Sequence, residues 1–197
     1  EIRIIMITGD YKITAQSIAN EINLAGKSDL RLISPEEVDK MISLELRENL
    51  LNNVVFYQAI PELKLRIVKE LQASGEVVAV TGDGVNDSLA LKQADIGVAM
   101  GMVGTAVAKE SADMILLDDN FATIVNAIKE GRTIWSNLKK FLFYVFSSNA
   151  GEFMVASFGM ISGLPIPILA VQILSVDLGT DILPSFALIF DPASKEE

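Results

Sequence analysis

The sequence predicts an α/β domain with a parallel sheet, joined to a transmembrane α-helical hairpin. Short apolar runs alternate with helix-length segments, as in sheets whose parallel strands are connected by helices. Two of these runs end in the same Thr-Gly-Asp turn, at 8–10 and at 81–83. Residues 135–197 hold only nine of the 42 charged side chains, and none lies within 153–176. An uncharged run of this length predicts a membrane segment.

The strand candidates are short, apolar and bounded by polar or glycine-rich turns. Such runs are typical of buried parallel strands, which need no alternation of polar and apolar residues. The predicted strands are 3–7, 54–58, 77–80, 96–100 and 114–117.

The helices between these strands carry recognisable start and stop signals. Ser34 and Glu37 form a capping box around Pro35, which occupies the first helical position. Pro61 opens another helix, and Gly75 ends it. Further helices are predicted over 11–24, from about Asn86 and from about Thr105.

Composition excludes several classes of chemistry. The chain has no cysteine and no histidine, so thiol nucleophiles, disulfides, imidazole bases and the usual zinc ligands are absent. A net charge of −10 without a basic face argues against nucleic acid as a partner. The 197 residues open within a predicted strand, without an initiator methionine or leader, so we expect a piece of a longer protein.

The charge distribution predicts a cytoplasmic domain over 1–134 and a transmembrane hairpin over 135–197. One long helix is expected from about Asn120 to Ser162, with no proline to interrupt it. Its residues 141–162 are predicted to span the membrane, and residues 164–190 to return.

Two details refine the hairpin. Lys139 and Lys140 precede the first span, which places the soluble domain on the cytoplasmic side of a multi-pass membrane protein. Gly179 and Pro184 flank polar residues, so the second span is expected to be broken near its middle.

Carboxylates follow the ends of two predicted strands. Ligands of open parallel sheets bind beyond these ends, so Asp10 and Asp83 are expected to face one crevice. Asn86 and Asp87 add hard oxygen ligands, which favour Mg²⁺. The glycines let backbone N–H groups approach a phosphate, the helix from about Asn86 offers its positive end, and Lys64 can supply a cation. The alternative is that these aspartates are turn residues or helix caps.

Polar side chains also recur inside the predicted membrane spans. Asn149 and Glu152 are three residues apart and share one helix face. Asp177, Thr180 and Asp181 repeat this geometry in the returning span. Carboxylates at membrane depth cost about 2.5–3.5 kcal/mol each even by low estimates, so they favour a cation pathway. The alternative is an interhelical polar clamp of protonated acids.

Four stretches carry a resemblance to a known family. They are TGDGVNDSLALKQADIGVAMG (81–101), ADMILLDDNFATIV (112–125), SSNAGE (147–152) and VDLGTD (176–181). The chain resembles P-type cation-transporting ATPases of the calcium and sodium/potassium pump branch. The match covers the latter half of the phosphorylation domain, which has a haloacid-dehalogenase-like (Rossmann-like) fold, and the fifth and sixth transmembrane helices.

The resemblance implies roles for the residues already singled out. Asp83 becomes a Mg²⁺ ligand, and the membrane stretches become part of the site for the transported cation, Ca²⁺ or Na⁺/K⁺. ATP, the lipid bilayer and the remainder of the same pump are the other implied partners. The residues expected around the phosphoryl group are Thr8, Gly9, Asp10, Lys64, Asn86 and Asp87.

The chain departs from the family pattern in three ways. Leu89 stands where the family usually has proline, and Gln58 stands where it usually has arginine. The DKTGT motif that carries the phosphorylated aspartate is absent, so this chain alone is expected to be inactive. Two alternatives stay open: a soluble haloacid-dehalogenase-like phosphatase and a non-catalytic membrane hairpin.

Overall fold

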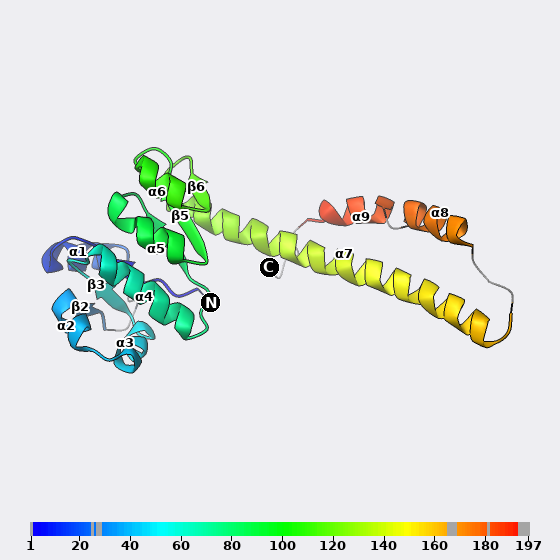
Figure 1. Cartoon of the computed structure of the whole chain (residues 1–197). Helices are drawn as coiled ribbons and strands as arrows, with labels where there is room; N and C mark the ends of the chain where they lie inside the picture. Colours follow the sequence, from blue (N-terminus) through cyan, green and yellow to red (C-terminus); the bar gives the residue numbers. More distant parts are fainter. Residues whose placement is uncertain (1, 25, 27–28, 165–168, 181, 193–197) are drawn as a thin grey trace. The chain divides into compact units, whose positions relative to one another are not determined.

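The computed structural model of the chain describes residues 2–24, 26, 29–164, 169–180 and 182–192 (Figure 1). The chain divides into two compact units, Glu1–Asn120 and Phe121–Glu197. The boundary predicted after residue 134 rests on charge, and it falls inside α7 (Phe121–Ile161) of the second unit.

Parallel strands form the centre of the first unit, as predicted. Within the described residues they make two three-stranded sheets, with the orders β1-β3-β2 and β4-β5-β6. The predicted parallel pairing is confirmed, and the described strands divide it between two sheets. β1 is only two residues long and pairs with β3 alone, and β4 pairs with β5 alone. The strands are β1 (Met6–Ile7), β2 (Arg31–Ile33), β3 (Val54–Phe56), β4 (Ala79–Gly82), β5 (Ile96–Met100) and β6 (Met114–Leu116).

The helices of the first unit connect these strands. The predicted capping box is confirmed: Ser34 accepts a hydrogen bond from the Glu37 N–H, and Glu37 accepts one from the Ser34 N–H. Thr105 caps α6 with its side chain alone, which accepts a hydrogen bond from the Ala108 N–H. The helical segments are α1 (Lys12–Glu21), α2 (Pro35–Lys40), α3 (Ser43–Leu50), α4 (Pro61–Ala73), the 3₁₀ turn η1 (Val85–Asp87), α5 (Ser88–Gln93) and α6 (Ala106–Ser111).

α4 contributes to two hydrophobic cores. Its Leu63 and Ile67 are four residues apart and pack with Phe56 of β3 in the largest cluster of buried apolar residues described. Val68, on another face of α4, packs against Ala90 of α5 beside the second sheet. α4 therefore links the two sheets, although no strand pairing among the described residues joins them.

The second unit consists of α7, α8 (Ala170–Thr180) and α9 (Ile182–Ile189), and α9 packs against α7 (Figure 1). The predicted long helix is confirmed. Gly163, with φ +69°, adopts the left-handed conformation that ends α7. In the second predicted span, helix is described over Ala170–Thr180 and Ile182–Ile189. The break predicted near its middle falls at Asp181, outside the described residues, and stays a prediction.

One helical stretch among the described residues, Val171–Leu188, is long and apolar enough to cross a membrane, with a mean hydropathy of 1.2. The span predicted over 141–162 stays a prediction. Asn149 and Glu152 lower the hydropathy of that part of α7.

Candidate functional site

The first Thr-Gly-Asp turn comes directly after β1 and closes on itself. The Thr8 hydroxyl donates to the Asp10 carboxylate at 2.8 Å, and Thr8 Oγ1 accepts a hydrogen bond from the Asp10 N–H at 3.1 Å. The segment after β3 holds the turn from one side, because the N–H groups of Gln58 and Ala59 donate to the carbonyls of Asp10 and Thr8. Gln58 adopts a left-handed φ of 49° there. Gly9 and Asp10 remain exposed.

The second turn is held from within by Asp87, which is 7% exposed. Its Oδ2 atom accepts hydrogen bonds from the backbone N–H groups of Asp83 at 3.3 Å and Gly84 at 3.1 Å. A Cβ atom at residue 82 would collide with the Asp87 side chain, so Gly82 is required for this packing. Asp87 is thus a group that shapes the turn.

Lys64 completes the arrangement around Asp87. Its Nζ atom lies 2.5 Å from Asp87 Oδ1, and both side chains are largely buried. This ion pair ties α4 to the turn after β4. The Lys64 ammonium carries three donors, so two remain for other oxygen atoms.

The side chains of Asp83 and Asn86 contrast with this buried pair. Both are exposed, and neither forms a hydrogen bond or ion pair with another described residue. The backbone of Asp83 is nevertheless fixed on both sides, since its carbonyl accepts a hydrogen bond from the Thr105 N–H at 2.8 Å. The turn therefore presents two oxygen-bearing side chains, available to a ligand, on a rigid backbone.

The strand-end carboxylates do not gather as expected. No three acidic side chains within the described ranges lie close enough together to hold a metal ion. Asp87 turns inward to Lys64, and Asp10 is engaged with Thr8 beside the other sheet. The remaining donor set still fits Mg²⁺, which commonly takes one or two protein carboxylates and completes its shell with phosphate oxygens and water.

The helix after the second turn begins later than predicted. η1 occupies Val85–Asp87, and α5 begins at Ser88 rather than near Asn86. The carboxylate of Asp87 takes up the backbone N–H groups of Asp83 and Gly84, just before η1. Leu89 lies in the first turn of α5, as expected, and is 51% exposed.

In the second unit, α7 carries Asn149 and Glu152, and α8 carries Asp177 and Thr180. Asp181 lies outside the described residues. Asp177 Oδ1 is buried and has no hydrogen-bond partner among the described groups. A buried acceptor without a donor is costly, and a bound cation would satisfy it.

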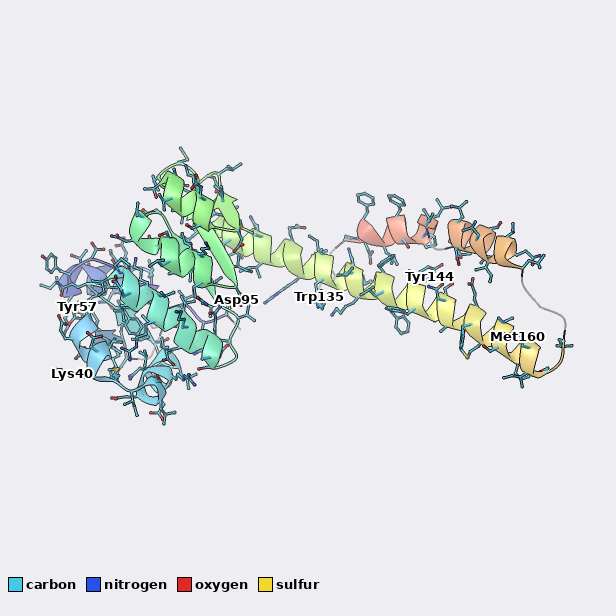
Figure 2. All side chains as sticks on the ribbon, viewed as in Figure 1. Lys40, Tyr57, Asp95, Trp135, Tyr144 and Met160 are labelled. Carbon is cyan, nitrogen blue, oxygen red and sulfur yellow. The ribbon has the colours of Figure 1, made fainter. Side chains whose placement is uncertain are left out.

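Tyr144 makes a contact that the sequence patterns did not indicate. Its hydroxyl donates to the carbonyl of Thr180 at 2.5 Å (Figure 2). This contact joins α7 to the end of the segment described as α8. The available signal was the spacing of eight residues between Tyr144 and Glu152, which places both on a similar side of α7.

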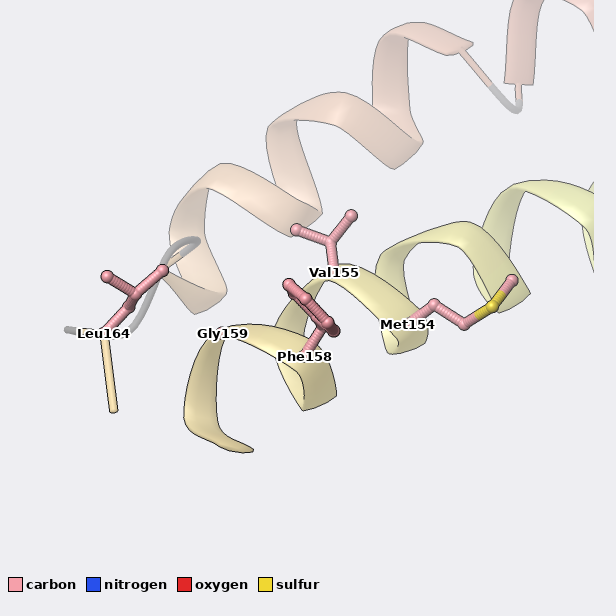
Figure 3. A pocket seen from close by; sticks show the side chains of 5 residues that line it. All are labelled: Met154, Val155, Phe158, Gly159 and Leu164. Atoms are coloured by element: carbon pink, nitrogen blue, oxygen red, sulfur yellow. The ribbon is translucent and has the colours of Figure 1, made fainter. Parts of the chain in front are cut away.

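A cavity of about 450 Å³ lies near the end of α7 (Figure 3). Its lining is apolar and carries no group suited to chemistry. The lining residues are Met154, Val155, Phe158, Gly159 and Leu164.

Family models match most of the chain. Residues 1–95 match the model described as haloacid dehalogenase-like hydrolase, and residues 64–128 match a second model of that description. Residues 165–197 match the model described as cation transporting ATPase, C-terminus. The first unit therefore has the haloacid dehalogenase-like fold, as predicted.

Curated cation-transporting ATPases are similar in sequence to nearly the whole of this chain. A calcium-transporting ATPase of Bacillus subtilis (strain 168) is 48% identical over 190 residues, which is 96% of this chain and 21% of the relative. The potassium-transporting ATPase alpha chain 2 of Rattus norvegicus is 43% identical, over 99% of this chain and 21% of its own. This chain belongs to the P-type cation-transporting ATPases and spans about a fifth of the length of these relatives.

A solved structure supports the same fold. The crystal structure of a zinc-transporting PIB-type ATPase matches 94% of this chain and 24% of its own, with a TM-score of 0.66 and 25% sequence identity. The match extends over both units, so it includes the helices of the hairpin.

Proposed function

We propose that this chain is part of an ATP-driven cation pump that couples formation and hydrolysis of an aspartyl phosphate to cation transport. One observation carries the proposal. A single chain holds the exposed carboxylate of Asp83 at a sheet edge and the unpartnered carboxylate oxygen of Asp177 on an apolar helix. The first suits a Mg²⁺–phosphate group, and the second suits a cation at membrane depth.

At the phosphoryl site, the residues of this chain position the phosphoryl group and neutralise its negative charge. Asp83 and Asn86 would hold Mg²⁺, which when bound neutralises charge on the phosphoryl oxygens. Lys64 directs its remaining donors toward those oxygens while its bond to Asp87 keeps the turn in place. The N–H of Gly9 supplies a neutral donor from the first turn. The Thr8 hydroxyl supplies a second one only when it turns away from the Asp10 carboxylate, to which it donates in this structure. The phosphorylated aspartate and the ATP-binding residues come from the remainder of the pump, because this chain lacks the DKTGT motif.

At the membrane site, oxygen ligands come from both arms of the hairpin. The break predicted between Gly179 and Pro184 would free backbone carbonyls as further neutral oxygen ligands. Several carboxylates suit a divalent ion such as Ca²⁺, and Na⁺ or K⁺ are the other candidates. Lys139 and Lys140 favour a cytoplasmic position for the first unit. The proposed ligands are Asn149, Glu152, Asp177, Thr180 and Asp181.

The test measures phosphoenzyme level in the intact pump against the concentration of Ca²⁺, Na⁺ or K⁺. We expect one ion to stimulate phosphorylation and Glu152→Gln to raise the concentration needed by about ten-fold, which corresponds to about 1.4 kcal/mol of lost binding. Glu130→Gln makes the same chemical change on α7 outside the predicted span, and it should leave the curve unchanged.

Two results would contradict the proposal. Superimposed curves for the wild type and Glu152→Gln would remove Glu152 from the coupled site, since linkage requires both sites to respond. Phosphatase activity without any cation dependence would instead favour the haloacid-dehalogenase-like phosphatase.

A further inference from the structure

A buried polar residue lies in the middle of α7. Asn137 is 6% exposed. Among the described residues of α7, only Asn137 and Gly159 are buried. A buried amide needs hydrogen-bond partners, because leaving it unpaired costs about 1–3 kcal/mol. The partners of Asn137 therefore indicate what α7 contacts at this point.

These partners lie just beyond the end of α9. The Asn137 side-chain amide donates to the backbone carbonyl of Asp191 at 2.8 Å. Lys140, one turn further along α7, places its Nζ atom 2.5 Å from Asp191 Oδ2 and 3.5 Å from Asn137 Oδ1. The three residues form a closed set, which we call the hairpin clamp.

The clamp lies at the open end of the hairpin, opposite the connection between α7 and α8. At the other end, the polypeptide connects α7 to α8 directly. Between the two ends, the Tyr144 hydroxyl holds the Thr180 carbonyl. Contacts at three levels thus fix how far α9 and α8 can slide along α7.

We propose that Asn137, Lys140 and Asp191 are positioning residues for the cation site. The clamp sets the register of α9 against α7 and so aligns the carboxylate of Asp177 with Glu152. Fifteen residues separate Asn137 from Glu152, about 22 Å along a helix, so the clamp acts through register and not through contact with the cation. This inference rests on the proposed function of the membrane carboxylates.

The experiment reverses the ion pair in the intact pump. Lys140→Asp and Asp191→Lys should each raise the cation concentration for half-maximal phosphorylation by about five-fold, while the phosphoenzyme level at saturating cation stays near that of wild type. The double variant Lys140→Asp/Asp191→Lys restores the pair with reversed charges. It should return the half-maximal concentration to within about two-fold of wild type.

Lys139→Asp is the matched control. It changes the same charge one residue away, and Lys139 makes no ion pair with any described residue. Its cation curve should coincide with that of wild type. A shift as large as that of Lys140→Asp would show a general effect of surface charge and would overturn the clamp. So would a double variant that fails to recover.

Thermal unfolding in detergent separates failure of the clamp from failure of the proposed function. The four proteins of the charge-reversal cycle should show coupling: the double variant melts higher than the two single losses together predict. Coupling without any cation-dependent phosphoenzyme, even in wild type, would retain the clamp and reject the pump. Additive melting temperatures would reject the clamp whatever the phosphoenzyme shows.

Discussion

The two Thr-Gly-Asp turns have the same sequence, but only the second leaves its aspartate carboxylate without a hydrogen bond inside the turn. In the first turn, the Asp10 carboxylate is engaged by the hydroxyl of Thr8 two residues earlier. In the second turn, the Asp83 carboxylate is available, because Asp87 takes over the hydrogen bonds that hold the backbone. The two turns differ in the residues after the motif: a helix begins two residues after Asp10, whereas Gly-Val-Asn-Asp comes after Asp83.

The comparison shows how a turn frees a charged side chain for a ligand. A carboxylate that accepts hydrogen bonds from its own turn loses part of its capacity to bind a cation. In the second turn, the buried Asp87 accepts these backbone hydrogen bonds instead and is neutralised by Lys64. The Asp83 carboxylate is therefore available to a ligand on a fixed backbone. Substitutions in and near the two turns can break or sharpen this contrast, and their expected effects differ widely in size.

The largest effect should come from removing the available carboxylate. We expect Asp83→Asn to reduce Mg²⁺-dependent phosphoenzyme formation in the intact pump by about 100-fold or more, since a metal ligand and its charge are lost. Asp10→Asn is the matched change in the other turn and should cost far less. Quantifying phosphoenzyme at several Mg²⁺ concentrations distinguishes the two, and equal losses would contradict the assignment of different roles.

The next effect concerns the buried pair. We expect Asp87→Asn to lower the free energy of unfolding by about 2 kcal/mol, because Lys64 is left buried without its counter-charge. Thermal or denaturant unfolding measures this loss. The double variant Lys64→Met/Asp87→Asn removes the unpaired charge and should be more stable than Asp87→Asn alone. If it is less stable, the pair does not hold the turn.

A smaller effect is expected at the start of α5. Leu89→Pro should change the free energy of unfolding by less than about 1 kcal/mol, with stabilisation favoured, because the first helical turn accepts proline and the unfolded chain becomes more restricted. Leu89 is half exposed, which leaves room for the ring. A fall of several degrees in melting temperature would show that the 3₁₀ turn continues into α5 with a bond that proline breaks.

The smallest effect is a pH dependence at the opposite edge of the second sheet. Asp95 accepts hydrogen bonds from the Val78 N–H at 2.8 Å and the Gln72 amide at 3.3 Å, and these bonds lower the pKa of its carboxyl below the usual 3.8 (Figure 2). A lowered folded-state pKa stabilises the protein above pH 3.8, and this contribution disappears as the pH falls through the folded value. Asp95→Asn should therefore flatten the acid limb of melting temperature against pH. An unchanged limb would contradict the assignment.

Much of the fold could be predicted from local signals that tertiary packing did not override. The strand 96–100 and the capping box at Ser34 were predicted to the residue, because apolar runs and caps act locally. The long helix was predicted because no proline interrupts 121–161. The separation into two sheets could not be predicted, since pairing between β1 and β4 depends on contacts distant in sequence.

The candidate site was predicted in its residue types more than in its geometry. Asp83 and Asn86 stood out through spacing alone. The inward turn of Asp87 depends on Lys64, twenty-three residues earlier in the chain, and on the lack of a side chain at Gly82. Tyr144 and Asn137 bond to backbone carbonyls, which leave no mark in the sequence of their partners.

The 41 residues of α7 form one helix without a break, and this fixes its rotational phase. Each residue of an α-helix turns the chain by about 100°, so Asn137, Tyr144 and Glu152 fall within an arc of about 80°. A single residue inserted between Asn137 and Tyr144 would rotate the two later side chains by about 100° away from the clamp. An insertion of seven residues would nearly restore their direction but displace them by about 10 Å. The hairpin thus tolerates substitution along α7 far better than any change in the length of this segment.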